Sequence, residues 1–277
     1  MRPIADITVV VPVRDDLQVE RCLRSFDCDS ARPLVVLNDA TAQVRRAVEQ
    51  SGADTVDLPD AGGPAACERG IEAAGTECVL MMDSDCVFLP GTLAAFVGAA
   101  GSADLVRGVT LFRHRTPAER LVSKVRARHT NSPHMVFKVP LLIDRRIRER
   151  IGGYVFDDRL AWTEDFDLTV RAKRAGLSVR RLTDAVVIHD ALSMRRDLVS
   201  SFRYGQGHRQ GVSLRLDGYR PVSRRRVLRG LVPAARRYGI WEAAYGLASN
   251  VSFAAGYASV AEEPDHYFQP LQKDVSR

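Results

Sequence analysis

Two aspartates separated by one serine follow an apolar run in the first third of the chain. The run Val79-Leu80-Met81-Met82 has the composition of a buried strand, and Asp83-Ser84-Asp85 comes next. Ligands of open α/β sheets collect at the carboxyl ends of the strands, and carboxylate oxygens suit Mg²⁺ or Mn²⁺. The motif therefore predicts a divalent-metal site, although aspartate and serine also favour ordinary turns.

A second acidic group stands at 164–167, just after Trp162. Thr163 is a suitable N-cap, and acidic residues in the first turn of a helix complement its dipole, so the group predicts a helix start. We expect the helix dipole to keep the Asp165 carboxylate ionised, and an ionised carboxylate can act as a general base. Helix stabilisation alone explains the charge but not the adjacent Glu164-Asp165 pair after a large aromatic residue.

A histidine ends the short apolar run Val186-Val187-Ile188. An imidazole at the end of a buried strand can bind a metal, but a single histidine in such a place more often has a structural role. His189 is therefore a candidate ligand only in combination with other groups.

Strand-like and helix-like segments alternate at short intervals around the first motif. Strands are expected at 7–13, 34–37, 55–58 and 78–82, the first of them a continuous β-branched run. Helices are expected at 16–26, 41–51 and 64–74, the last opened by a glycine-glycine-proline turn. This order predicts a parallel sheet with right-handed crossovers.

The pattern becomes mixed after Asp85. Helices are expected near 90–99, 117–128 and 164–175, and strands near 104–112, 135–139, 178–182 and 185–189. From about residue 194 the segments are basic and helical. The expected fold class is α/β, with a Rossmann-like, nucleotide-binding mixed sheet flanked by helices and a helical C-terminal tail.

Seven segments in this order resemble the family-2 glycosyltransferases, which have the GT-A fold. The resemblance covers about residues 7–210. It implies a GT-A domain at 1–210, with a donor-binding half at 1–110 and an acceptor half at 111–210, followed by a helical extension at 211–277. The seven segments are 9–15, 35–41, 62–74, 83–85, 151–154, 164–171 and His189.

The resemblance also implies an activity, namely that of a metal-dependent inverting glycosyltransferase whose donor is a nucleotide-diphosphate sugar. Asp85 would bind Mg²⁺ or Mn²⁺ together with Asp83 and His189. Asp165 would be the catalytic base, beside Glu164. One displacement assisted by one base inverts the anomeric centre. The implied donor-binding residues are Pro12, Val13, Arg14, Asp39, Asp83, Ser84 and Arg209.

The sequence departs from the family pattern on the donor side and in the tail. Asn38 stands where an aspartate is common, and Cys67-Glu68 replaces the usual Arg-Asn or Leu-Asn pair. The segment 206–210 is similar to the Q-x-x-R-W motif of processive polysaccharide synthases, but Gln210 replaces its tryptophan. We therefore do not expect processive extrusion of a polymer.

Charge is unevenly distributed along the chain, whose net charge is +6. Residues 1–110 carry 9 basic and 17 acidic side chains, residues 111–150 carry 11 and 3, and residues 195–237 carry 12 and 2. Such asymmetry indicates an anionic acceptor or an anionic surface as a partner. Solubility and a genomic preference for arginine would explain the same counts.

Two other classes of function stay open at this stage. A nucleotidyltransferase on a similar sheet would normally have a glycine-rich phosphate loop after the first strand, and residues 12–16 do not provide one. A non-enzymatic module could bind anions or nucleic acid through 195–237, but few aromatic residues interleave with its arginines, so no nucleic acid is expected. A glycosidase is disfavoured, because its paired acid and nucleophile could be assigned only to carboxylates that already have roles in the Asp-Ser-Asp motif and the Glu-Asp pair.

The expected location is the cytoplasm, with peripheral contact to the inner face of the membrane left open. The five cysteines form no C-x-x-C pair, and neither an export signal nor a transmembrane segment is expected. The nucleotide sugar is the expected partner. The acceptor stays open between a natural product, a peptide and a cell-envelope glycan, as do the sugar, the nucleotide and the oligomeric state.

Overall fold

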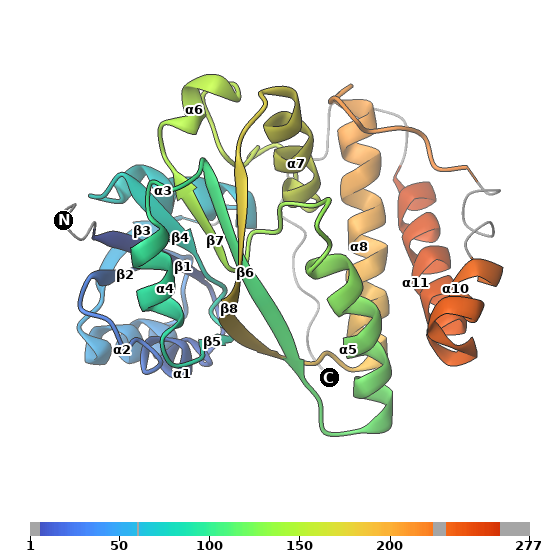
Figure 1. Ribbon diagram of the computed structural model, residues 1–277, viewed down its shortest axis with the longest axis horizontal. Helices are drawn as coiled ribbons and strands as arrows, with labels where there is room; N and C mark the ends of the chain where they lie inside the picture. Colours follow the sequence, from blue (N-terminus) through green and yellow to red (C-terminus); the bar gives the residue numbers. More distant parts are fainter. Residues whose placement is uncertain (1–5, 60, 224–230, 261–277) are drawn as a thin grey trace.

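One mixed sheet forms the centre of the molecule (Figure 1). The computed structural model describes residues 6–59, 61–223 and 231–260. Within them, eight strands lie in the order β3-β2-β1-β4-β7-β6-β8-β5. The strands are β1 (Ile7–Val13), β2 (Ala31–Asn38), β3 (Asp54–Leu58), β4 (Cys78–Met81), β5 (Cys86–Phe88), β6 (Leu105–Arg113), β7 (Leu141–Asp144) and β8 (Val179–Asp190).

The first four strands form the parallel half that the sequence predicts. β1 pairs in parallel with β2 and with β4, and β2 pairs in parallel with β3. The register sets Val13 opposite Leu37 and Val10 opposite Met81, so the carboxyl ends of these strands lie at one edge. β7 continues the sheet antiparallel to both β4 and β6.

Helices cover both faces of the sheet because successive residues of a buried strand point to opposite sides. Val9 and Val11 belong to a core cluster with residues of α1, α2 and α4, whereas Val10 packs with residues of α3 and α7. The helices are α1 (Val19–Leu23), α2 (Ala42–Ser51), α3 (Gly63–Ala73), α4 (Thr92–Ala99), α5 (Pro117–Thr130), α6 (Ile147–Arg150), α7 (Glu164–Arg174), α8 (Met194–Ser213), α10 (Leu231–Tyr238) and α11 (Ile240–Ser259).

The prediction of a strand at 135–139 is wrong. This segment is a loop, and the strand of this region is β7, which begins at Leu141. Side chains distant in the sequence occupy the backbone groups that a strand would use: Arg107 donates to the Met135 carbonyl, and Thr169 Oγ1 accepts from the Val136 N–H at 2.8 Å. The two strands predicted at 178–182 and 185–189 are one strand, β8, and the short β5 was not predicted.

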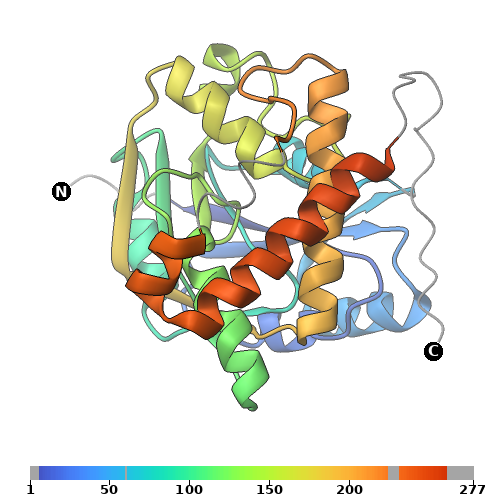
Figure 2. The ribbon, with the colours of Figure 1, turned by 90° about the vertical axis from the view of Figure 1, so that its right-hand side faces the viewer.

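The C-terminal helices form an outer layer. α11 lies against α8, on the side of α8 that faces away from the sheet (Figures 1 and 2). The domain boundary expected at residue 210 falls within α8, where the helix is continuous. The boundary therefore stays a prediction made from the family resemblance. Among the residues that the structure describes, no helix combines the length and the apolar character needed to cross a membrane.

Candidate active site

The predicted metal ligands Asp85 and His189 are brought together across two neighbouring strands. β5 pairs antiparallel with β8, which sets Cys86 opposite His189. Asp85 Oδ2 lies 3.2 Å from His189 Nε2. The His189 Nδ1–H donates to the Asp190 carbonyl at 2.5 Å, an assignment made from the contact, and this bond turns Nε2 toward Asp85.

Charge attraction within this pair outweighs its burial. Burial opposes both charges, but the mutual contact raises the pKa of His189 above its usual value and lowers the pKa of Asp85. The contact therefore favours the ion pair between the protonated imidazole and the ionised carboxylate. A cation that binds both of them must displace that proton, which makes binding weaker at low pH.

Cys86 lies within reach of the same point but is a poor metal ligand. It is fully buried, and burial together with Asp83 and Asp85 raises the pKa of its thiol well above the usual value. The protonated thiol donates to Asp85 Oδ1 at 3.7 Å. Cys86 therefore supports the Asp85 carboxylate from the core side, and the ligand atoms offered to a cation are those of Asp85 and His189.

A lysine links Asp83 to the predicted catalytic pair, Glu164 and Asp165. Lys138 Nζ lies 3.3 Å from Asp83 Oδ1 and 3.6 Å from Glu164 Oε1, and the Lys138 backbone N–H donates to Asp165 Oδ1 at 2.8 Å. The Lys138 side chain is only 19% exposed. Burial disfavours its charge, but Asp83 and the acidic pair raise the pKa of Lys138 well above its usual value, so the ammonium stays protonated.

Lys138 is the member of this cluster that sequence reasoning did not identify. It lies in the segment 135–139, which was expected to be a strand, and a lysine four residues after a histidine forms no known motif. The signal that could have found it is its rarity, because Lys138 is one of four lysines in the chain, whereas arginine provides the other basic residues.

The expectation that Asp165 is ionised by the helix dipole is wrong. Burial and the neighbouring Glu164 raise the pKa of Asp165 to about 8, although Lys138 acts in the opposite direction. The carboxylate accepts from the loop N–H of Lys138. Removal from water and the nearby Glu164 carboxylate therefore raise the pKa of Asp165 more than the helix dipole lowers it.

The start of α7 is held in place by a tyrosine from outside the predicted motif. Thr163 adopts a left-handed conformation, with φ of 71°, and its side chain does not cap the helix as expected. Tyr219 instead donates to the Thr163 carbonyl at 3.0 Å, and its hydroxyl also contacts Thr163 Oγ1. Farther along α7, Asp167 pairs with Arg171, whose guanidinium donates to carbonyls of the loop 151–155.

The predicted donor-binding residues of the first two strands lie at the carboxyl edge of the sheet. Arg14 Nη2 donates to Asp39 Oδ2 at 3.1 Å, which links the ends of β1 and β2. Ser84 Oγ donates to Asp16 Oδ2 at 3.2 Å, so the loop after β1 also contacts the aspartate motif. Pro12 is partly exposed, whereas the Val13 side chain is buried in the core, which leaves its backbone as the group a ligand could reach.

The positions that depart from the family pattern have structural partners. The Asn38 side chain exchanges two hydrogen bonds with the backbone of Ala61, at 2.7 and 3.0 Å. Glu68 accepts from the Val155 and Phe156 N–H groups, both at 3.0 Å. Asn38 and Glu68 therefore hold loops beside the donor edge.

Arg209 lies apart from the aspartate motif in its described contacts. It belongs to α8 and donates to the Tyr257 hydroxyl of α11 at 3.0 Å. Its guanidinium also lies over the Tyr257 ring. A role of Arg209 in donor binding therefore stays a prediction.

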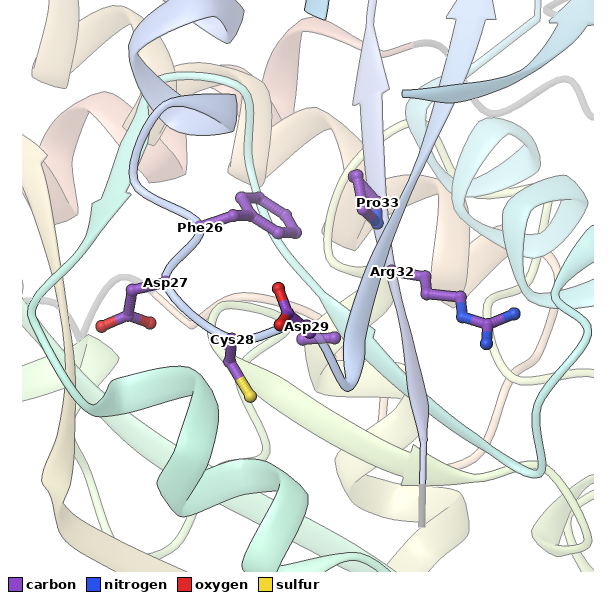
Figure 3. A pocket seen from close by; sticks show the side chains of 7 residues that line it. Phe26, Asp27, Cys28, Asp29, Arg32 and Pro33 are labelled. Atoms are coloured by element: carbon purple, nitrogen blue, oxygen red, sulfur yellow. The ribbon is translucent and has the colours of Figure 1, made fainter. Parts of the chain in front are cut away.

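A shallow hollow elsewhere on the surface does not match the predicted site. It is lined by residues 26–29 and 31–33, and Figure 3 shows Asp27, Asp29 and Arg32 around it. It lies at the amino end of β2, whereas the candidate site lies at the carboxyl ends of the strands. Asp27 accepts from the Gly91 N–H at 2.8 Å and Arg32 pairs with Asp6, so these charges join neighbouring segments.

Comparison with solved structures identifies the fold. A mannosyltransferase from Pyrobaculum calidifontis, PcManGT, solved in complex with GDP-Man and Mn²⁺, matches with a TM-score of 0.55 and 19% identity, over 94% of this chain and 77% of that one. Residues 1–349 of TarS from S. aureus match with a TM-score of 0.53 and 17% identity, over 91% and 92%. No protein-family model matches the sequence, and a search of curated proteins found no match. The predicted GT-A glycosyltransferase fold is confirmed.

Proposed function

We propose that the protein transfers a sugar from a nucleotide-diphosphate sugar to an acceptor, with inversion at the anomeric carbon. The observation that carries the proposal is the ionic bridge through Lys138. It joins Asp83 of the aspartate motif to Glu164, beside the Asp85–His189 pair. This bridge links the proposed donor side to the proposed base side of the site, which supports the proposal.

The donor set of Asp85 and His189 fits a divalent cation. One carboxylate and one imidazole suit Mn²⁺, and the PcManGT complex contains both GDP-Man and Mn²⁺. Mg²⁺ would favour oxygen ligands and so would depend more on Asp83. When bound, the cation offsets the negative charge that develops on the departing diphosphate.

Asp165 is the proposed base, with Glu164 beside it. Its raised pKa is typical of a group prepared to exchange a proton near neutral pH. Accepting the proton of the acceptor nucleophile while the diphosphate leaves from the opposite face is a single displacement, which inverts the anomeric centre. The mechanism needs no covalent intermediate.

Lys138 has two proposed roles in this reaction. Its ammonium keeps Asp83 and Glu164 close together although both are acidic, and its backbone N–H orients Asp165. Arg14, Asp39 and Ser84 would contact the nucleotide, whose base and ribose would lie at the ends of β1 and β2. We place donor binding in residues 1–110 and acceptor binding in residues 111–210 and the tail.

Calorimetry tests the donor side without knowledge of the acceptor. UDP-, GDP- and dTDP-sugars are titrated into the protein with and without Mn²⁺, and we expect at least one to bind in a metal-dependent way. Asp85→Ala should abolish the metal-dependent part, and His189→Ala should weaken it less, because carboxylate and diphosphate oxygens would remain as ligands. The control is Asp54→Ala, which removes an exposed carboxylate at the amino end of β3.

Unchanged metal-dependent affinity in Asp85→Ala would overturn the metal assignment. Metal-independent binding of every donor in the wild-type protein would overturn the proposed cofactor.

A further inference from the structure

Large apolar side chains are exposed where α10 turns into α11. Ile240 is 71% exposed and Trp241 is 74% exposed, the highest fractions among the large apolar side chains that the structure describes. Tyr238, at the end of α10, is 39% exposed. We call Arg236, Arg237, Tyr238, Ile240 and Trp241 the α10–α11 corner. Exposing an isoleucine and a tryptophan side by side to water is unfavourable, which indicates a surface that is covered in use.

The same corner is basic. Arg236 and Arg237 are exposed in the last turn of α10. The centroid of the Tyr238 ring lies 3.7 Å from Arg128 Cζ and 5.4 Å from Arg237 Cζ. The nearby Glu242 is already paired with Lys124 at 2.9 Å. Within the described part of the chain, no acidic side chain forms an ion pair with Arg236 or Arg237, so positive charge flanks the apolar side chains.

The outer position of the corner suits a broad partner. α10 and α11 lie at the edge of the molecule, on the far side of α8 from the sheet (Figure 1). Arg236 and Arg237 also end the strongly basic block at 195–237, with 12 basic and 2 acidic residues. Arginines attract the anionic groups of a wide surface. Tryptophan, tyrosine and isoleucine side chains can insert between those groups.

We propose that the α10–α11 corner binds the surface of a bilayer that contains anionic lipid. Tryptophan and tyrosine prefer the boundary between headgroups and acyl chains, where an apolar ring and a polar edge are both satisfied. The arginines pair with the anionic headgroups, and Ile240 adds apolar area. The corner contacts the surface from outside, because none of the described helices crosses a membrane.

The corner is connected to the helix that follows the proposed metal site. Tyr245 of α11 donates to Asp197 Oδ2 of α8 at 2.5 Å, and α8 begins five residues after His189. Attachment at the corner would therefore hold α8 at a membrane through the packing of α11 against α8. Vesicle binding needs neither donor nor acceptor, so the inference stands or fails separately from the proposed sugar transfer.

Sedimentation with vesicles tests the proposal on the full chain. We expect the wild-type protein to bind vesicles of phosphatidylcholine mixed with phosphatidylglycerol, and to bind pure phosphatidylcholine far more weakly. Arg236→Gln and Arg237→Gln should each weaken binding about fivefold, as expected for one basic residue near an anionic surface. The double variant Ile240→Asp, Trp241→Asp should abolish it.

Val251→Asp is the matched control, because Val251 is 53% exposed on the same helix but lies away from the corner. It should leave vesicle binding unchanged. Fluorescence gives an independent readout, since Trp162 and Trp241 are the only tryptophans. Anionic vesicles should shift wild-type emission to shorter wavelength, and Trp241→Phe should lose the shift while still binding.

Several results would overturn the proposal. They are failure of the wild-type protein to bind anionic vesicles, equal binding to neutral vesicles, and equal loss in Val251→Asp. A second copy of the chain would be the occupant instead if analytical ultracentrifugation without lipid shows a dimer that Trp241→Asp dissociates.

Discussion

Lys138 balances the charges of three acidic side chains at the proposed site. Without a cation, Asp83 and Glu164 would repel each other, and Asp165 would repel both when it is ionised; the ammonium lies within 3.6 Å of Asp83 and Glu164. The protonation of Asp165 then depends on two neighbours of opposite sign. Glu164 raises its pKa and Lys138 lowers it. This opposition can be tested by changing each neighbour separately.

Asp165→Asn should reduce turnover by about 10²- to 10⁴-fold, because the amide is nearly the same size but cannot accept the proton. Nucleotide-sugar affinity should survive, since Asp85 and His189 are unchanged. Glu164→Gln should have the milder effect. Turnover and donor affinity are measured for both variants once an acceptor is known. Near wild-type turnover in Asp165→Asn would move the base to Glu164 first and to Asp167 next.

The pH profile should show a base that is protonated at neutral pH. Because the pKa of Asp165 is raised to about 8 and the base acts when ionised, kcat/KM should fall as the pH drops below about 8. Glu164→Gln removes a negative charge that raises the pKa of Asp165, so it should move this limb of the profile to lower pH. Lys138→Met removes a positive charge that lowers the pKa, so it should move the limb to higher pH.

Lys124→Met is the control for these shifts, because Lys124 pairs with Glu242 at the outer layer. It should leave the profile in place. Profiles that do not move in either Glu164→Gln or Lys138→Met would exclude Asp165 as the group that titrates.

At the scale of elements, the loop 131–138 shows how strands and helices position the site. Buried Arg107 of β6 donates to the Thr130 carbonyl at 2.7 Å and to the Ser132 carbonyl at 2.8 Å. Asn131 exchanges two hydrogen bonds with the Thr110 backbone, at 3.0 and 2.8 Å. These contacts fix the start of the loop that carries Lys138 toward α7.

The crossing of α8 and α11 depends on two glycines that allow close backbone approach. A Cβ on Gly256 would lie 1.9 Å from the Phe202 carbonyl oxygen, and one on Gly205 equally close to the Phe253 carbonyl oxygen. Gly256→Ala should therefore lower the free energy of unfolding by about 1–3 kcal/mol. Urea denaturation measures the change.

Gly246→Ala is the matched control on α11, since a Cβ there meets no atom within 4 Å. Alanine is the better helix former, so this variant should raise the free energy of unfolding by about 0.5–1 kcal/mol. Equal stability of the two variants would show that the helices separate readily at the crossing.

At the scale of the molecule, the two basic blocks have different roles. In the block 111–150, seven of the 11 basic residues form ion pairs within the chain. Their partners include Glu68, Asp83 and Asp104 of the acidic first half. This block therefore joins parts of the fold and contributes little to an external anion. The block 195–237 retains exposed arginines.

The acceptor affinity should depend on salt if the second block meets an anionic acceptor. Exposed charges are screened over about 8 Å at physiological ionic strength, so the acceptor KM at saturating donor should rise steeply with added salt. Thermal unfolding at the same salt concentrations checks that the fold is intact. A KM that does not change with salt would contradict binding of an anionic acceptor by residues 195–237. Solubility or the structure of the tail would then be the role of this block.

The local sequence determined the parallel half of the sheet, the helices around it and two groups of acidic residues. Strands β1 to β4 and helices α2 and α3 were predictable because apolar runs and helical spacing depend on neighbouring residues. The positions of Asp83-Ser84-Asp85 after a strand and of Glu164-Asp165 at a helix start follow from the same local patterns.

Only the tertiary structure decided what surrounds those acidic groups. The segment 135–139 has the composition of a strand, yet hydrogen bonds from Arg107 and Thr169, about 30 residues away, hold it as a loop. That loop brings Lys138 to Asp83 and Glu164, and the same burial raises the pKa of Asp165. Desolvation and charge proximity depend on distances between atoms remote in the sequence, and no local pattern of residue types encodes those distances.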